Sequence, residues 1–225
     1  MKKQKDFPFA MYMLAAFLLW TASLRFVDVQ AIGPQGSAVG FATLNAFIHN
    51  LTGVHMFLYT LTDWLGLVPF AFVTGFALFG LIQWIQRKHL LKVDSSILVL
   101  GGFYVAVLAV YVLFEILVVN YRPVLIHGVL EASYPSSTTT LTLCVMPTAV
   151  MQLRARIQNK AFKRCITSAI TAFVAFMVIG RLLSGVHWFT DIIGGILLST
   201  GLVLMYRAII RTLKPSLATE NRNIF

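Results

Sequence analysis

The residues with the most evident capacity for chemistry lie between Arg181 and Asp191, in the run R-L-L-S-G-V-H-W-F-T-D. This run sets an arginine, a histidine and a carboxylate between two long apolar stretches, where ionisable groups are costly and usually functional. His187 and Asp191 are four residues apart, so they share one face if a helix begins near His187. The carboxylate can then hold one ring nitrogen while the other stays free to attack. Because a guanidinium can bind phosphate bidentately, Arg181 completes a pattern that predicts phosphoryl chemistry at a membrane face.

Two shorter motifs precede this run. Arg122-Pro123 follows one apolar stretch, and Tyr134-Pro135-Ser136-Ser137-Thr138 opens the next. Proline followed by serines favours a helix start, and the N-terminus of a helix is a ready anion site. We therefore expect Ser136 and Ser137 to contribute to phosphate binding.

The elements that must position these residues are membrane helices. The chain has 225 residues, of which 58% are hydrophobic and only 12% charged, and several apolar runs approach the length that spans a bilayer. The sequence predicts an all-α integral membrane protein forming one polytopic domain over residues 1–225, with no second domain. Six spans are expected, and a segment with mixed polarity between the first and second suits a helix lying at the interface. The expected spans are residues 7–27, 67–85, 97–119, 136–153, 166–183 and 189–209, with the interfacial segment at 41–64.

The basic residues indicate which way the chain crosses the membrane. Six spans put both termini on one side, and 15 of the 18 lysines and arginines fall in segments on that side. The positive-inside rule then places both termini in the cytoplasm and the motifs on the extracytoplasmic side of the plasma membrane. The same asymmetry accounts for the net charge of +10 without nucleic acid as a partner. Arg122 and Arg181 are exceptions to it, at the ends of different helices.

The order and spacing of the three motifs resemble those of the type 2 phosphatidic acid phosphatase family of membrane lipid phosphatases. That family's pattern is K-x6-R-P, then P-S-G-H, then S-R-x5-H-x3-D, and Arg181, His187 and Asp191 fit the third motif closely. The resemblance implies that His187 forms a phosphohistidine and that Asp191 orients its ring. It also implies that Arg122 and Arg181 bind the phosphoryl oxygens together with Ser136 and nearby N–H groups. This scheme requires no metal ion or other cofactor.

Three positions depart from the family pattern. Glu115 occupies the position of the lysine, Gly180 that of the serine, and Thr138 that of the histidine which protonates the leaving group. A threonine hydroxyl donates a hydrogen bond but is a poor acid near neutral pH. Either His127 or Glu131, in the same outer connection, supplies the missing proton, or the substrate needs little acid because its leaving group is a phosphate. Glu115 is equally consistent with a structural ion pair to Arg122, seven residues further on.

These observations predict a hydrolase that acts on a lipid phosphate or pyrophosphate in the membrane. A polyprenyl pyrophosphate is favoured over phosphatidic acid or phosphatidylglycerophosphate, because a departing phosphate delocalises its own charge. The alternatives are a catalytically impaired protein that binds or moves lipid phosphates, and a lipid phosphotransferase. The sequence leaves the oligomeric state open.

Overall fold

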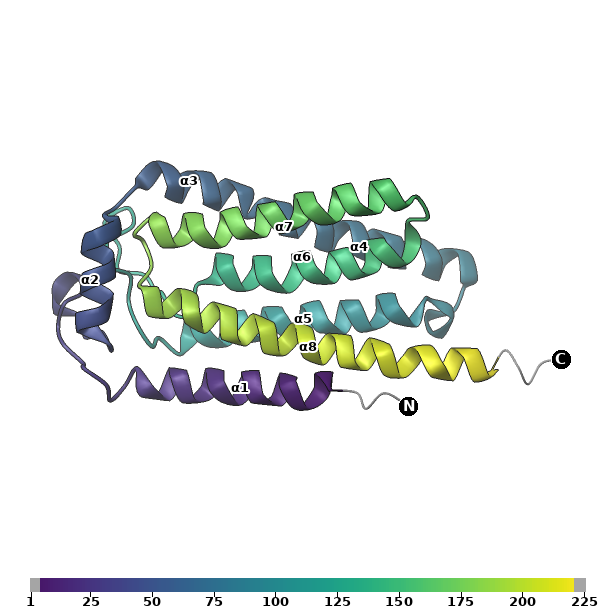
Figure 1. Cartoon of the computed structure of the whole chain (residues 1–225), viewed down its shortest axis with the longest axis horizontal. Coiled ribbons are helices and arrows are strands. Elements are labelled where there is room, and N and C mark those ends of the chain that lie inside the picture. Colours follow the sequence, from purple (N-terminus) through teal and green to yellow (C-terminus); the bar gives the residue numbers. More distant parts are fainter. Residues whose placement is uncertain (1–4, 221–225) are drawn as a thin grey trace.

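The computed structural model describes residues 5–220, with side chains to residue 213, and confirms the all-α prediction. This part of the chain contains isolated β-bridges but no β-strand. The α-helices are α1 (Asp6–Ser23), α2 (Ala42–Thr52), α3 (Met56–Leu65), α4 (Leu67–Arg87), α5 (Ser95–Ile116), α6 (Ser137–Arg156), α7 (Lys160–Leu183) and α8 (Phe189–Glu220). Short 3₁₀ turns occur at Pro34–Gly36 and Leu90–Lys92. The long helices run roughly side by side as one bundle (Figure 1).

Five helical segments within the described residues are long and apolar enough to cross a membrane, and the protein is a multi-pass membrane protein. They are Asp6–Ser23, Met56–Arg87, Ser95–Ile116, Lys160–Leu183 and Phe189–Leu213. Helix α6 was expected to be a further span, but it is too polar to be counted with the others. The total of six spans therefore stays a prediction.

Helix α6 is polar because it lies inside the bundle. It contacts α4, α5, α7 and α8, and four of its threonines are buried. Its polar groups find partners within the protein: Thr148 Oγ1 lies 3.2 Å from the Tyr104 hydroxyl, and Gln152 Nε2 donates to the Ser96 carbonyl at 3.0 Å. Such bonds between helices satisfy groups that lipid cannot. The buried position of α6 thus explains how a weakly apolar helix fits among membrane spans.

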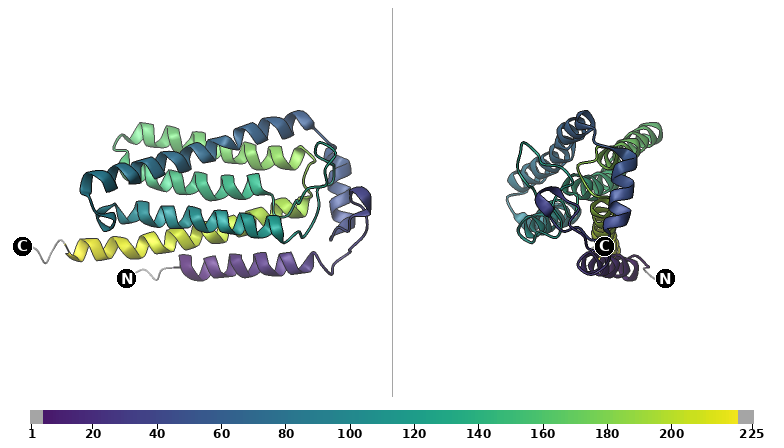
Figure 2. Two further views of the ribbon diagram at one scale, coloured as in Figure 1. Left: turned by 180° about the vertical axis from the view of Figure 1, so that it is seen from behind. Right: turned by 90° about the vertical axis from the view of Figure 1, so that its left-hand side faces the viewer.

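The segment predicted to lie at the interface divides into two parts. Helix α2 lies across one end of the bundle, as expected of an interfacial helix (Figure 1). Residues 56–64 do not join it, and the second long helical segment begins at Met56 rather than at residue 67. Gly66 keeps right-handed helical angles (φ −58°, ψ −19°), so the chain passes from α3 into α4 without reversing (Figure 2). The polar residues His55 and Asp63 concealed this continuity in the sequence.

The connection between α5 and α6 folds back on itself at the same end of the bundle as α2 (Figures 1 and 2). Bridges join Tyr121 to Ala132 and Ile126 to Val129, which makes residues 120–133 a short hairpin-like excursion. The turn between α7 and α8 lies at this end too. The three motifs, which are far apart in the sequence, therefore meet at one end of the bundle.

Candidate active site

The imidazole of His187 is the centre of this cluster. Its Nε2 lies 3.2 Å from Arg122 Nη1 and 3.2 Å from Arg181 Nη2, and all three residues are buried. An arginine can only donate, so Nε2 accepts both hydrogen bonds and the proton of the neutral ring is on Nδ1. The nitrogen that faces the two guanidinium groups is therefore the unprotonated one, and its lone pair can attack once a ligand takes over the hydrogen bonds of the arginines.

The opposite ring nitrogen is held by Ser133. Nδ1 lies 3.2 Å from the Ser133 carbonyl oxygen and 3.1 Å from its hydroxyl, which in turn donates to Asp191 Oδ2. Asp191 itself is 3.8 Å from Nδ1, beyond hydrogen-bonding distance. The carboxylate also accepts from the Trp188 N–H at 2.9 Å and from Asn120 Nδ2 at 3.4 Å. Ser133 thus lies between the histidine and the carboxylate that the sequence predicted to touch directly.

The surroundings of His187 keep its ring neutral. Burial lowers the pKa of His187 well below its ordinary value, and the positive charges of Arg122 and Arg181 lower it further. Both effects disfavour a second proton on the ring. A neutral imidazole next to two guanidinium groups is ready to attack an anion that those groups hold.

Each arginine is anchored on its far side. Arg122 Nε lies 3.0 Å from Glu131 Oε2, across the hairpin. Arg181 Nη1 lies 3.8 Å from Asp63 Oδ1 and 3.4 Å from the Thr62 hydroxyl, and the guanidinium carbon is 5.1 Å from the centre of the Tyr59 ring. Arg181 is only 1% exposed, so these contacts from α3 fix its position. The two guanidinium groups are thereby held in place before any ligand binds.

The turn that carries His187 is fixed by a close backbone approach. Gly185 has a positive φ of 69°, and a Cβ added there would lie 2.0 Å from the Gly53 carbonyl oxygen. The His55 N–H also donates to the Ser184 carbonyl at 3.0 Å. The turn between α7 and α8 therefore rests on the connection between α2 and α3, which leaves no room for a side chain at position 185.

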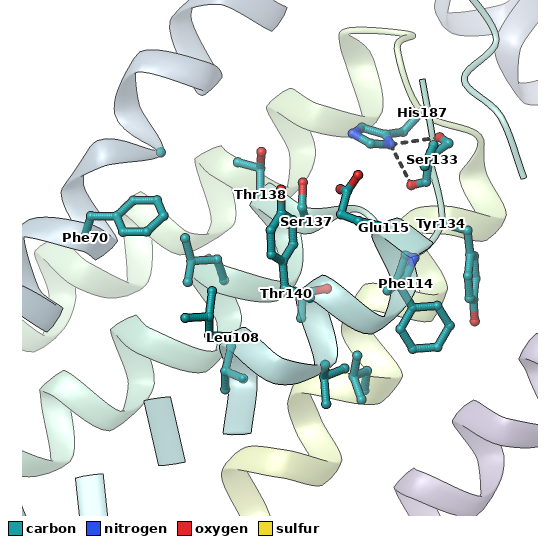
Figure 3. Close-up of a pocket in the computed structure, with 18 of the residues that line it drawn as sticks. Phe70, Leu108, Phe114, Glu115, Ser133, Tyr134, Ser137, Thr138, Thr140 and His187 are labelled. Carbon is teal, nitrogen blue, oxygen red and sulfur yellow. Dashed lines mark hydrogen bonds between the residues drawn. The ribbon is translucent and has the colours of Figure 1, made fainter. Parts of the chain in front are cut away.

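A cavity of about 420 Å³ extends from His187 into the bundle. Its polar end includes His187, Ser133, Glu115, Ser137 and Thr138, as Figure 3 shows. The rest of the lining is largely apolar and comes from α4, α5 and α6, with Phe70, Leu108 and Phe114 among the residues in view. A small polar end on an apolar cavity suits a ligand with a charged head and a hydrocarbon chain.

The predicted accessory residues are distributed unevenly around this cavity. Glu115 and Thr138 line it, and Glu115 does not pair with Arg122 as the alternative interpretation proposed, because Glu131 holds that arginine. His127 is exposed at the turn of the hairpin (φ 51°), and it does not line the cavity. Ser136 precedes α6 and is buried, with its hydroxyl donating to Thr139 Oγ1 at 3.0 Å. Ser137 is thus the serine of this pair that faces the cavity.

Sequence reasoning missed three residues of the site. The first is Ser133, which contacts His187. The others are Asn120, which contacts Asp191, and Asp63, which contacts Arg181. Asp63 was assigned to an interfacial segment, and no spacing rule connects Ser133 or Asn120 to a histidine more than 50 residues away. Among the residues that the structure describes, no group of three or more His, Cys, Asp or Glu side chains is arranged to hold a metal ion.

An all-α membrane bundle with a buried histidine between two guanidinium groups is suited to phosphoryl transfer on a lipid. Residues 115–215 match the model of the PAP2 superfamily, and all three motifs lie within that range. The resemblance to the type 2 phosphatidic acid phosphatase family is thereby confirmed over these residues, and this similarity supports the function of a membrane lipid phosphatase.

A solved structure shares the fold. The chain superimposes with a TM-score of 0.62 on the crystal structure described as the first transmembrane PAP2 type phosphatidylglycerolphosphate phosphatase from Bacillus subtilis. The two chains are 17% identical, and the match covers 90% of this chain and 96% of the other. No curated protein matches the sequence. At this identity the structural match concerns the arrangement of helices and not the substrate.

Proposed function

We propose that this protein hydrolyses a lipid phosphate or pyrophosphate through a phosphohistidine at His187. One observation carries the proposal: Nε2 of His187 is 3.2 Å from both Arg122 and Arg181, at the polar end of an apolar cavity. A phosphoryl group bound by the two guanidinium groups would take over the hydrogen bonds that they donate to Nε2, which would leave the lone pair of Nε2 directed at phosphorus. The apolar part of the cavity would hold the adjoining hydrocarbon chain.

The first step forms a bond from Nε2 to phosphorus and breaks the bond from phosphorus to the leaving oxygen. The ring becomes positively charged, and the contact of Nδ1 with Ser133, backed by the carboxylate of Asp191, stabilises that charge. Arg122 and Arg181 neutralise the charge that develops on the phosphoryl oxygens. In the second step water attacks phosphorus and releases His187. The scheme needs no metal ion.

The leaving oxygen needs a proton, and we infer that Glu115 provides it. The family histidine is absent at Thr138, and Glu115 lines the same cavity as Thr138 and His187. Its carboxylate extends into the cavity in Figure 3. His127 and Glu131 are weaker candidates, because the former does not line the cavity and the latter pairs with Arg122. A carboxyl group can donate a proton in the first step and activate water in the second.

A matched pair of variants tests this role. Glu115→Gln keeps the shape of the side chain but removes the acid, and general acid catalysis typically contributes about 10²–10⁴-fold. We expect Glu115→Gln to lose at least a hundredfold on a phosphomonoester lipid and much less on p-nitrophenyl phosphate, whose leaving group needs no proton. Asp28→Asn, which lies outside the cavity lining, serves as the control of equal charge. Equal losses on both substrates would assign Glu115 a structural role instead.

A polyprenyl pyrophosphate is the favoured substrate, since its leaving group is a phosphate. Phosphatidic acid and phosphatidylglycerophosphate are further candidates, and the protein from Bacillus subtilis is named for the latter. The motifs lie at the opposite end of the bundle from the α6–α7 loop, which is rich in basic residues. With the positive-inside rule, this supports a site on the extracytoplasmic side of the plasma membrane with both termini in the cytoplasm.

Phosphate release by the purified protein tests the proposal. A panel of lipid phosphates and pyrophosphates is compared between the wild-type chain and His187→Ala, and acid-quenched samples are analysed for phosphohistidine. We expect release and a labelled intermediate with the wild-type chain and neither with the variant. Release that persists in His187→Ala would refute the assignment of the nucleophile.

Thr138 occupies the position of the family histidine that acts as the general acid, and this also favours a second candidate function. In that role the protein binds lipid phosphates without hydrolysing them. In that case lipid binding would depend on Arg122 and Arg181, while phosphate release would stay at background for the wild-type chain and for His187→Ala. A phosphotransferase would instead form phosphohistidine but release phosphate only slowly unless a second lipid acceptor is added.

A further inference from the structure

A second cavity, of about 300 Å³, lies at the end of the bundle away from His187. It forms where α6 ends and α7 begins, a junction visible at the right of Figure 1. Four basic residues and two hydroxyl residues line it: Arg154, Lys160, Lys163, Arg164, Thr167 and Ser168. No carboxylate is among these lining residues. The proposed hydrolysis has no use for this cavity.

The four cations of this cavity lack partners among residues 5–213. Within residues 5–213 none of their charged groups makes a hydrogen bond or an ion pair. Other arginines at the same end of the bundle do have an ion-pair partner, since Arg87 and Arg156 share Asp94. The positive-inside rule explains why basic residues lie on this side. It does not explain why four basic residues that lack a partner among residues 5–213 surround one cavity.

The chemistry of the lining selects a phosphate group. Guanidinium groups bind phosphate oxygens bidentately, ammonium groups add charge, and hydroxyls donate further hydrogen bonds. Thr167 and Ser168 lie about two turns into α7, a helix apolar enough to span the membrane, so we expect the cavity to lie near the depth of lipid head groups. Basic pockets at the ends of membrane helices bind anionic head groups in this way.

We propose that this cavity binds the phosphate group of an anionic ligand, supplied by a phospholipid of the leaflet opposite the active site. A free phosphate would satisfy the same cations, so the test must separate the two sources. In an anionic bilayer the site would be occupied, and the bound phosphate would link the C-terminal end of α6 to the N-terminal end of α7.

The test uses two double variants of the full chain. Lys160→Gln with Lys163→Gln removes two charges from the cavity, and Lys88→Gln with Lys92→Gln removes two from a loop at the same end of the bundle. Binding of short-chain phosphatidylglycerol in detergent is measured by native mass spectrometry and by the shift in melting temperature. Phosphatidylcholine and inorganic phosphate are the parallel ligands. Circular dichroism establishes that both variants are folded.

We expect phosphatidylglycerol to bind the wild-type chain and the loop variant alike. Because a charge-assisted hydrogen bond to phosphate contributes roughly tenfold to binding, the cavity variant should bind at least about tenfold more weakly. The same dependence on the cavity lysines with inorganic phosphate would support the phosphate site and assign it to a soluble anion. Equal weakening in both variants, or binding that neither variant alters, would overturn the proposal.

Discussion

The hydroxyl of Ser133 offers a sharp test of the site, because it contacts both His187 Nδ1 and Asp191. Ser133→Ala removes this hydroxyl but leaves the backbone carbonyl, which still lies 3.2 Å from Nδ1. The ring therefore keeps one acceptor, and Asp191 keeps its bond from the Trp188 N–H. What is lost is the connection from the carboxylate to the ring, whose charge rises when phosphohistidine forms.

The expected size of the effect follows from these remaining contacts. A hydrogen bond to a charged group contributes about 1.5–3 kcal/mol, which corresponds to roughly 10- to 150-fold in rate. Since the carbonyl of Ser133 still accepts from the ring, we expect kcat/KM to fall about tenfold, near the lower limit. Asp191→Asn should lose at least a hundredfold, because it removes the charge itself. The double variant should be little worse than Asp191→Asn, as both changes interrupt the same connection.

The assay is phosphate release from the best lipid of the panel, with kcat and KM determined separately. Positioning of the ring predicts a loss mainly in kcat, and Ser133→Thr should restore part of the activity by replacing the hydroxyl. Nitrogen NMR of labelled histidine adds a direct readout, since the wild-type ring should carry its proton on Nδ1. Activity of Ser133→Ala within twofold of wild type would refute the reasoning, as would effects that simply add to those of Asp191→Asn.

Three further predictions concern pH dependence and stability. Because the pKa of His187 is lowered, the ring should stay neutral at pH values below about 6.5, the ordinary pKa of histidine. The plot of kcat/KM against pH should therefore show no loss near pH 6.5 from this group. A loss at that pH that shifts in Arg122→Gln would contradict this. Asp6 joins α1 to α8 through Arg207, with Asp6 buried and the arginine 38% exposed, so Asp6→Asn should lower stability by about 1–3 kcal/mol, seen as a lower melting temperature in detergent. Gly185→Ala should destabilise the protein and abolish hydrolysis, because the added Cβ would clash with the Gly53 carbonyl. The control is Gly101→Ala, in open space on α5, which should be neutral or slightly stabilising. Similar melting temperatures for the two alanine variants would contradict this prediction.

The positions of most helices could be predicted from the sequence, because hydropathy indicates which segments are excluded from water. Helices α1, α5 and α6 begin and end within about four residues of the predicted spans, whereas α7 begins earlier than predicted, at Lys160, and α8 continues past residue 209 to Glu220. The second span was predicted from residue 67, where α4 begins, but the helical segment that contains it starts at Met56, because polar residues on α3 contact the site. Asp63 is the example: its pairing with Arg181 is a contact between helices, and no local pattern in the sequence reports such a contact.

For the site, the sequence by itself determined which chemical groups are available: Arg122, Arg181, His187 and Asp191, with a threonine and a glutamate at two family positions. Only the tertiary structure decided that Ser133 lies between the histidine and the carboxylate, and that Glu115 faces the cavity while Glu131 holds Arg122. The reason is physical. Spacing along a helix fixes contacts within one or two turns, whereas the path of the hairpin at 120–133 depends on what the rest of the bundle leaves room for.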